Sequence, residues 1–350
     1  MKKIVFTGGG TGGHIMPNLA IIENVKNEYK IYYIGTNGME KEIISKYPEI
    51  TFIEIEAVKF IRTLSPKNLL IPFKLFKSIK HAKKILEEIK PNLIFSKGGF
   101  VSIPTCLAGN RLNIPVLTHE SDLSIGLANK IIARKAKFLC CSFQETADKY
   151  EKNSICTGSP IRNNILNGDK QIVIKRHNIN NSKPTILIVG GSLGAKVINT
   201  IIWENIKTLT EKYNIIHIVG KSKLNKNLNN IKNYIQLDFV SDIENYFSAS
   251  DIIISRAGSN TIFELLALNK PMLLIPLSKA SSRGDQILNA ENFQKNNYAN
   301  VLLQENLSFD TLIDKINETL KNKESYINSM KSSKIPNGTD TIIKLIKSII

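Results

Sequence analysis

Short apolar runs alternate along the chain with longer segments whose apolar positions recur at helical spacing. The runs are rich in isoleucine, valine and phenylalanine, and polar or glycine-containing segments bound them, as they bound buried β-strands. Alternation of strands with helices predicts parallel sheets made of βαβ units, and continuously apolar strands predict sheets covered on both faces. The predicted strands cover residues 4–6, 31–34, 93–95, 116–118, 138–141, 186–189, 215–219, 252–254 and 272–275.

The two halves of the chain begin in the same way. Residues 4–14 and residues 186–196 each comprise a strand, a glycine-rich turn and the start of a helix, and a polar stretch at 163–183 separates the halves. We therefore predict an α/β protein with two Rossmann-like domains facing each other across a cleft. The predicted domains are residues 1–160 and 161–335, and a final helix in residues 336–350 is expected to return to the first domain.

Composition limits the location of the protein. The 350 residues suffice for two domains. Polar residues interrupt every apolar stretch well before the roughly 20 residues that a transmembrane helix needs. The N-terminus lacks the apolar core of a signal peptide, so we expect a cytoplasmic protein.

The four cysteines are Cys106, Cys140, Cys141 and Cys156. None forms a C-x-x-C pair, and no histidine cluster accompanies them. We expect reduced thiols, with neither a disulfide framework nor a zinc site.

The net charge is +17, from 47 basic and 30 acidic residues. A solvated lysine-rich surface would explain this charge, and so would attraction to nucleic acid, anionic lipid or a phosphorylated substrate. The basic residues concentrate between residues 59 and 90, where Glu87 and Glu88 are the only acids.

Three glycine-rich turns follow predicted strands, at residues 8–13, 96–99 and 190–194. Glycine lets the backbone approach a phosphate, and the helix N-terminus that follows favours an anion. Residues 8–13 contain G-x-G-x-x-G, but a dinucleotide fold also needs an acid where the second strand ends. Residues 34–37 hold none, which disfavours a dehydrogenase. Each turn alone can be structural; together they predict a cleft with phosphate-binding rims.

Several polar residues next to these turns have a functional and a structural interpretation. His14 follows the first turn. Its functional interpretation is a general base, which a neutral imidazole can be, and its structural interpretation is a cap of the helix. His119 follows a strand, and we favour a structural role for it. Ser259 or Asn260 is expected to cap a helix on which Glu264 can bind a ribose diol. Asp285 and Gln286 suit sugar hydroxyls.

Seven segments in this order make the chain resemble the MurG family of peptidoglycan N-acetylglucosaminyltransferases. The resemblance implies the GT-B fold, UDP-N-acetylglucosamine as donor, lipid I as acceptor and lipid II as product, with inversion and no cofactor. The segments are residues 8–20, 96–104, 119–130, 157–162, 190–195, 255–271 and 285–293.

The resemblance also implies a role for individual residues. Asp122 departs from some members, which carry asparagine beside the transferred sugar; aspartate can accept but cannot donate as an amide does. The implied donor contacts are Thr11, Gly12 and Gly13, with Arg162 and Ser192 near the UDP diphosphate, Val240 at uracil through its backbone, Ser259, Asn260, Thr261 and Glu264 along the nucleotide, and Gln286; Gly98 and Gly99 are implied, with the first turn, at the acceptor diphosphate.

The implied reaction is a single displacement. The C4 hydroxyl of the acceptor's N-acetylmuramyl unit attacks the anomeric carbon of UDP-N-acetylglucosamine, and His14 is our candidate general base. Helix N-termini and the third glycine turn are expected to stabilise the departing UDP. No D-x-D motif is placed to hold a metal. Two alternatives are a UDP-N-acetylglucosamine 2-epimerase on the same fold and a non-enzymatic nucleic-acid-binding protein; no RNA-binding signature favours the latter, and we expect no nucleic-acid partner.

A lipid-linked acceptor requires the enzyme to reach a membrane, and residues 67–80 have suitable chemistry. After Pro72 they predict a helix. We predict peripheral binding to the anionic cytoplasmic face of the cell membrane through the first domain. The alternative is an ordinary amphipathic helix packed on the sheet. The predicted apolar stripe is Leu75, Phe76, Ile79, Ala82 and Leu86, and the basic stripe is Lys74, Lys77, Lys80 and Lys84.

Overall fold

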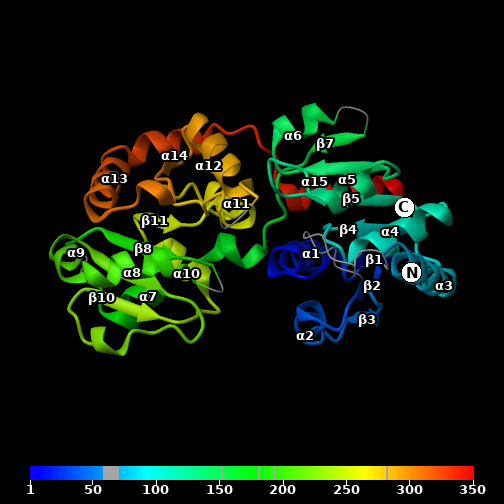
Figure 1. Cartoon of the computed structure of the whole chain (residues 1–350), viewed down its shortest axis with the longest axis horizontal. Helices are drawn as coiled ribbons and strands as arrows, with labels where there is room; N and C mark the ends of the chain where they lie inside the picture. The colour runs from blue at the N-terminus through cyan, green and yellow to red at the C-terminus, as the bar shows by residue number, and fades with distance from the viewer. Residues whose placement is uncertain (58–70, 151–152, 180–181, 192–193, 281–282) are drawn as a thin grey trace. The chain divides into compact units, whose positions relative to one another are not determined.

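The computed structural model describes residues 1–57, 71–150, 153–179, 182–191, 194–280 and 283–350. The chain divides into two compact units (Figure 1). Unit 1 comprises Met1–Arg162 and Ile335–Ile350, and unit 2 comprises Asn163–Lys334. Unit 2 is therefore an insertion between the body of unit 1 and its last helix.

Unit 1 contains a sheet of seven strands in the order β3-β2-β1-β4-β5-β6-β7, all paired in parallel. All five strands predicted in this half are confirmed. The remaining two, β3 and β7, were not predicted, because nearly all of their residues are half-buried or exposed. The strands are β1 (Lys3–Thr7), β2 (Lys30–Gly35), β3 (Ile50–Glu54), β4 (Leu93–Ser96), β5 (Val116–Glu120), β6 (Phe138–Cys141) and β7 (Ser154–Cys156).

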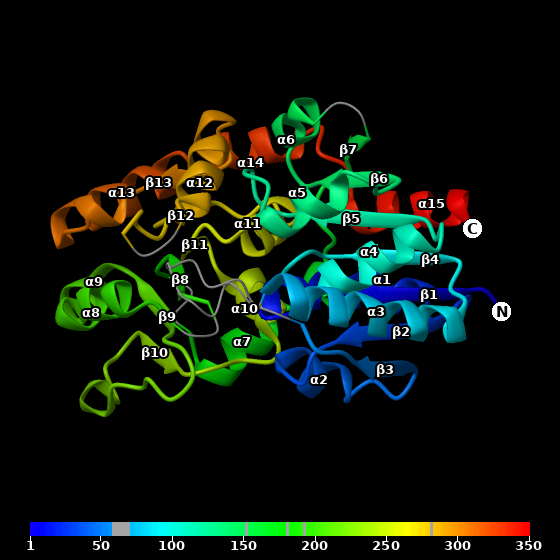
Figure 2. The ribbon, with the colours of Figure 1, turned by 45° about the vertical axis from the view of Figure 1, so that its right-hand side comes forward.

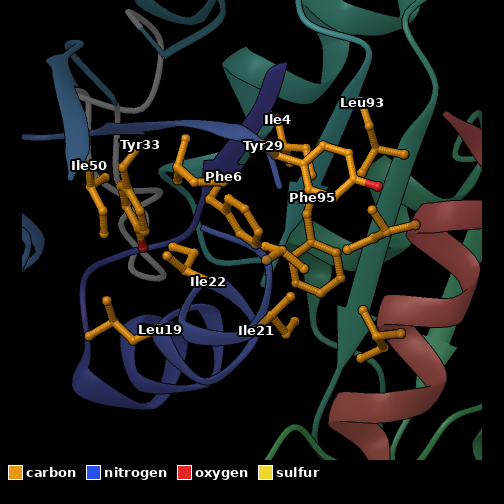
Figure 3. Close-up of a cluster of buried hydrophobic side chains, with 14 of the residues drawn as sticks. Ile4, Phe6, Leu19, Ile21, Ile22, Tyr29, Tyr33, Ile50, Leu93 and Phe95 are labelled. Carbon is orange, nitrogen blue, oxygen red and sulfur yellow. The ribbon is translucent and has the colours of Figure 1, made fainter. Parts of the chain in front are cut away.

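Helices cover both faces of this sheet, because alternate side chains of each strand point to opposite faces. Ile4 and Phe6 belong to a buried cluster with residues of α1 and α15 (Figure 3). Val5 belongs to a second cluster, with residues of α3 and α4. Figure 2 shows α3 in front of the sheet and α15 behind it. The helices of unit 1 are α1 (Gly12–Val25), α2 (Met39–Ile44), α3 (Ile71–Ile89), α4 (Ser102–Arg111), α5 (Leu127–Ala133), α6 (Gln144–Lys149) and α15 (Gly338–Ile349).

Helix α15 completes the core of unit 1. Ile342 and Ile346 are fully buried against the cluster that contains β1 and α1. The Asn337 side chain caps this helix by accepting from the backbone N–H of Thr339 at 3.0 Å. The Thr339 hydroxyl in turn bonds the backbone N–H and carbonyl of Ile161, at 3.0 and 2.9 Å. The two segments by which the chain leaves and re-enters unit 1 are thus fastened to each other.

Unit 2 contains a sheet of six parallel strands in the order β10-β9-β8-β11-β12-β13. The four strands predicted in this half are confirmed. The two edge strands were not predicted: β13 has only two residues, and β10 is mostly half-buried. The strands are β8 (Thr185–Val189), β9 (Asn214–Ile218), β10 (Tyr234–Leu237), β11 (Ile252–Ser255), β12 (Met272–Leu274) and β13 (Asn300–Val301).

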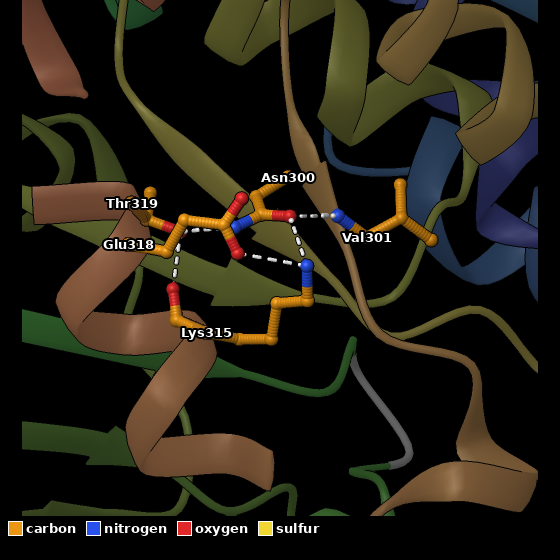
Figure 4. A network of polar contacts seen from close by, with 5 residues as sticks. All are labelled: Asn300, Val301, Lys315, Glu318 and Thr319. Atoms are coloured by element: carbon orange, nitrogen blue, oxygen red, sulfur yellow. Dashed lines mark hydrogen bonds and ion pairs between the residues drawn. The ribbon is translucent and has the colours of Figure 1, made fainter.

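A polar network holds α13 against the edge strand β13 (Figure 4). The Asn300 amide donates to the Thr319 hydroxyl at 3.2 Å, and its Oδ1 accepts from Lys315 at 3.2 Å. Lys315 also pairs with Glu318 at 2.8 Å. The α-helices of unit 2 are α7 (Lys170–His177), α8 (Lys196–Glu204), α9 (Ile206–Lys212), α10 (Ile243–Ala249), α11 (Ser259–Ala267), α12 (Asp285–Lys295), α13 (Phe309–Lys321) and α14 (Lys323–Lys331).

Both sheets reverse their winding direction at one point, between β1 and β4 in unit 1 and between β8 and β11 in unit 2. In open parallel sheets, ligands bind beyond the carboxyl ends of the strands at such a point. The glycine-rich turns follow β1, β4 and β8, so each lies at a switch point.

Within the described ranges, no helix is both long and apolar enough to span a bilayer. All four cysteine thiols are free.

Candidate active site

In unit 1, the turns after β1 and β4 contact each other at the switch point. Gly99 has φ +79°, and a Cβ there would lie 2.9 Å from the Gly9 carbonyl oxygen and 3.3 Å from the His14 ring. Any larger residue at 99 would displace the first turn or the imidazole. The structure therefore brings together His14 and the predicted acceptor-diphosphate turn at Gly98 and Gly99.

His14 lies in the first turn of α1 and is half-buried. Its Nδ1 lies 2.9 Å from the hydroxyl of Thr11, the residue that precedes the helix. When Nδ1 carries the proton and donates it to Thr11, the Nε2 lone pair can accept a proton from a substrate hydroxyl. Thr11 is thereby placed as the group that orients the imidazole. Gly12 and Gly13 begin α1 beside it.

A buried carboxylate that the sequence did not reveal supports the first glycine turn. Glu40, on α2, accepts from the backbone N–H of Thr36 at 2.9 Å, from its hydroxyl, and from the backbone N–H of Gly10 at 3.2 Å. Burial opposes ionisation of Glu40, but these hydrogen bonds outweigh it and hold the pKa below its usual range. Because its oxygens are engaged by the turn, Glu40 shapes the loop and does not replace the ribose-binding acid of dinucleotide folds.

The end of β5 and the turn that follows it carry the next polar groups, and His119 lies inside the strand and not after it as predicted. His119 is fully buried, and its Nε2–H donates to the Gly158 carbonyl at 3.0 Å. Burial and the nearby Lys97 ammonium hold its pKa well below the usual range, so the imidazole is neutral. This environment agrees with the structural role favoured from the sequence.

Glu120 organises this turn from inside. Its carboxylate accepts from the backbone N–H of Asp122 at 3.1 Å, from that of Gly126 at 2.9 Å and from the Asn129 amide at 2.9 Å. Burial raises its pKa. A Cβ on Gly98 would lie 2.7 Å from Asn129, so the turn after β4 packs directly on this network. Asp122 is half-buried in the same turn.

In unit 2, a cavity of about 510 Å³ opens at the switch point between β8 and β11. It has the size of a small-molecule site. Its lining comes from the turn after β8, the turn after β11 and the first turns of three helices. The lining residues are Val189, Gly190, Gly191, Gly194, Ala195, Lys196, Val197, Ser255, Arg256, Gly258, Thr261, Leu277, Gln286 and Gln304.

This cavity has the electrostatics of an anion site. Helices α8, α11 and α12 begin at its wall, and their N-terminal N–H groups and dipoles favour negative charge. Arg256 and Lys196 also line the cavity, and neither was assigned a role from the sequence. Arg256 donates to the carbonyls of Ile275 and Pro276 at 3.0 and 3.3 Å, and burial lowers its pKa. These bonds hold a guanidinium against the cavity.

The cavity includes some of the predicted donor contacts. Thr261 and Gln286 line it, and the Gln286 Oε1 accepts from the Leu277 backbone N–H at 3.1 Å. Glu264 lies three residues after Thr261 on α11, hence on the same helix face. The predicted cap was wrong: Gly258 precedes the helix, and Ser259 and Asn260 are its first two residues. A serine inside the first turn cannot act as the N-cap, and Ser259 is buried.

The remaining predicted residues lie elsewhere. Arg162 is the last residue of the body of unit 1, where the chain crosses into unit 2. Val240 is half-buried in the loop after β10. Its neighbour Phe239, which the sequence analysis missed, is 61% exposed and offers a flat face on which a base can stack. Ser192 lies outside the described residues. No group of three or more metal-ligating side chains occurs within the ranges that the structure describes.

Two Rossmann-like units with glycine-rich turns at their switch points are an architecture that nucleotide-sugar glycosyltransferases use, and the family models place the chain in that class. The model of the glycosyltransferase family 28 N-terminal domain matches residues 4–139, and that of the family 28 C-terminal domain matches residues 185–346. A Clostridium botulinum protein is 47% identical over 99% of both chains and is named UDP-N-acetylglucosamine--N-acetylmuramyl-(pentapeptide) pyrophosphoryl-undecaprenol N-acetylglucosamine transferase. The crystal structure of Acinetobacter baumannii MurG matches with TM-score 0.80 and 26% identity, over 99% of this chain and 100% of that one.

The chain belongs to the MurG family of family 28 glycosyltransferases, and its fold is GT-B. A crystal structure described as a putative UDP-N-acetylglucosamine 2-epimerase from Listeria monocytogenes also matches, with TM-score 0.64 over 99% of this chain and 96% of that one. At 12% identity this likeness shows the shared fold alone. The relative at 47% identity and the two family 28 models confirm the transferase interpretation of the sequence over the epimerase alternative.

Proposed function

We propose that this protein transfers N-acetylglucosamine from UDP-N-acetylglucosamine to the C4 hydroxyl of the N-acetylmuramyl unit of lipid I, which gives lipid II. The observation that carries the proposal is the pair of switch-point sites, each in its own unit, in a chain that is 47% identical to a transferase of that name. Unit 2 binds the donor, and unit 1 binds the acceptor and supplies the base.

The donor diphosphate occupies the cavity of unit 2. The helix N-termini at Lys196 and Ser259 face the negative charge that grows on UDP as the glycosidic bond breaks, and Arg256 adds a guanidinium. Fixed dipoles of this kind stabilise a leaving group without reorganising. Val240 reads uracil through its backbone, and Phe239 stacks on the ring. Arg162, in unit 1, remains a predicted diphosphate contact, as does Ser192, which lies outside the described residues.

In unit 2, Gln286 is a further contact of the donor, and the ribose lies against Ser259, Asn260, Thr261 and Glu264. In unit 1, Asp122 lies beside the transferred sugar. The acceptor diphosphate binds the turn at Gly98 and Gly99 together with the turn at Gly12 and Gly13. The acceptor hydroxyl loses its proton to His14 as it attacks the anomeric carbon. A single displacement inverts the α linkage of the donor to a β(1→4) bond.

Replacing Glu264 by glutamine should weaken UDP binding by at least about tenfold, since a hydrogen bond to a charged group contributes about 1.5–3 kcal/mol. Calorimetric titration with UDP measures this loss. The loss should shrink when 2′-deoxy-UDP replaces UDP, because one of the two ribose hydroxyls is then absent. Glu291→Gln, an exposed change on α12, is the matched control. Unchanged UDP affinity in a folded Glu264→Gln protein would remove the ribose assignment.

The membrane contact that we propose is the exposed start of α3. Phe73 and Phe76 are 74% and 61% exposed, and Lys74, Lys77 and Lys80 are exposed beside them. The prediction that the whole apolar stripe faces the membrane was partly wrong. Ile79, Ala82 and Leu86 are buried in the core of unit 1, as expected for an amphipathic helix packed on the sheet, and Leu75 is half-buried against that core. Residues 67–70 of the predicted segment lie outside the described residues.

The decisive experiment incubates the purified protein with labelled UDP-N-acetylglucosamine and a soluble lipid I analogue. The expected product is a β(1→4)-linked disaccharide that requires the acceptor. Conversion of the UDP-sugar to its 2-epimer without acceptor would instead indicate an epimerase. Titration of nucleic-acid binding against salt tests the non-enzymatic alternative, for which steep salt dependence is expected. We expect no binding at physiological salt.

A further inference from the structure

A lysine is buried beneath the switch point of unit 1. Lys97 follows β4 directly, its backbone N–H donates to the Thr7 carbonyl at 2.9 Å, and only 2% of the residue is exposed. An ammonium group in such a place is costly unless charged or polar groups compensate it. Burial lowers the pKa of Lys97 to about 8, which still leaves the group mostly protonated at neutral pH.

The compensating groups lie at the end of β5 and in the turn that follows it. The Lys97 ammonium donates to the hydroxyl of Ser121, the residue between Glu120 and Asp122 in the chain, and both carboxylates favour the charged form of Lys97. The two carboxylates are two residues apart and repel each other, since Asp122 raises the pKa of Glu120. Glu120 is fixed by three N–H donors. The hydrogen bond to Ser121 thus places a buried cation beside a segment that holds two acids.

We propose that Lys97 is a positioning residue, whose charge balances Asp122 and so holds the turn at residues 120–122 in the shape that receives the transferred sugar. The inference rests on the proposed function, in which Asp122 lies beside that sugar. It follows that the identities of residues 97 and 122 are coupled through charge. Removing the ammonium alone leaves two facing carboxylates without a cation, whereas removing one charge of each sign keeps the local sum unchanged.

The test is a double-mutant cycle of Lys97→Met and Asp122→Asn. We expect Lys97→Met to lower kcat with the soluble acceptor by about tenfold or more, and Asp122→Asn to restore it to within about threefold of Asp122→Asn alone. UDP affinity should not change, because the UDP cavity is lined by unit 2. A role confined to the Ser121 hydrogen bond would not be rescued in this way. Equal activity of Lys97→Met and the unchanged protein, or no rescue by Asp122→Asn, would overturn the proposal.

Thermal unfolding provides a second readout that does not depend on the reaction. The melting temperature should fall in Lys97→Met and recover in the double variant. Lys270→Met is the matched control, because Lys270 is a half-buried lysine of unit 2 that donates to the carbonyls of Ser248 and Ser250. Asp122→Asn should not rescue it. If Lys97→Met does not fold, Lys97→Gln takes its place in the cycle. A protein without disaccharide product would refute the proposed function, while additive melting temperatures would refute the charge coupling.

Discussion

Replacing His14 by alanine should lower turnover about 10²- to 10⁴-fold, the range that a positioned general base contributes. The imidazole lies at the switch point of unit 1, beside Gly99 and bonded to Thr11. Without it, the acceptor hydroxyl must attack with its proton in place or lose it to water. Initial rates with the soluble acceptor, at saturating donor, measure the effect on kcat.

Two further variants separate catalysis from folding. His81→Ala removes an exposed histidine from α3 of the same unit and should leave turnover unchanged. Thr11→Val removes the partner of Nδ1 and should produce an intermediate loss, because the ring loses its orientation but keeps its basicity. UDP affinity should be the same in the His14→Ala and His81→Ala proteins. Near-normal turnover of a folded His14→Ala protein would exclude His14 as the base.

Replacing Lys74, Lys77 and Lys80 by glutamate should abolish co-sedimentation with vesicles that contain phosphatidylglycerol. Each lysine near an anionic surface contributes about 1 kcal/mol, and each glutamate adds repulsion. Phe73 and Phe76 alone offer too little apolar area for stable attachment. Activity on the soluble acceptor should be preserved, since the switch-point residues are untouched.

The matched control carries the same charge change at a distant place in the sequence. Lys321, Lys331 and Lys334, which are exposed on or just after α13 and α14, are replaced by glutamate. That protein should still sediment with the vesicles. If both triple variants lose binding equally, net charge governs the attachment and the start of α3 is not the contact. If neither loses it, the contact lies elsewhere.

The sequence revealed those parts of the fold that residue identity encodes locally. Buried strands such as β1 and β8 contain uninterrupted apolar runs, and the turns after them need glycine because their backbone has positive φ, so both are visible in a linear pattern. The edge strands β10 and β13 were missed, because a strand with partly exposed residues or only two residues leaves no apolar run. The apolar stripe on α3 was visible, but the pattern could not tell core from membrane.

The missed site residues depend on contacts between distant segments. Glu40 acts on Gly10 because α2 folds back over the first turn, thirty residues away in sequence. Arg256 became a candidate only when its guanidinium was found against the cavity wall. In the sequence, Lys97 cannot be told from a surface lysine. Only the structure shows that it is buried and that its ammonium donates to Ser121.

The position of α15 has a consequence for biosynthesis. A ribosome releases the chain from its N-terminus, so Ile342 and Ile346 become available to the core of unit 1 only after the whole of unit 2 has been made. The strands of unit 2, by contrast, lie within one uninterrupted stretch, from Thr185 to Val301. The later-made unit can therefore close first. Until the last helix emerges, the apolar residues of β1 and α1 that α15 covers in the finished protein stay exposed, and exposed apolar surface favours aggregation of a nascent chain.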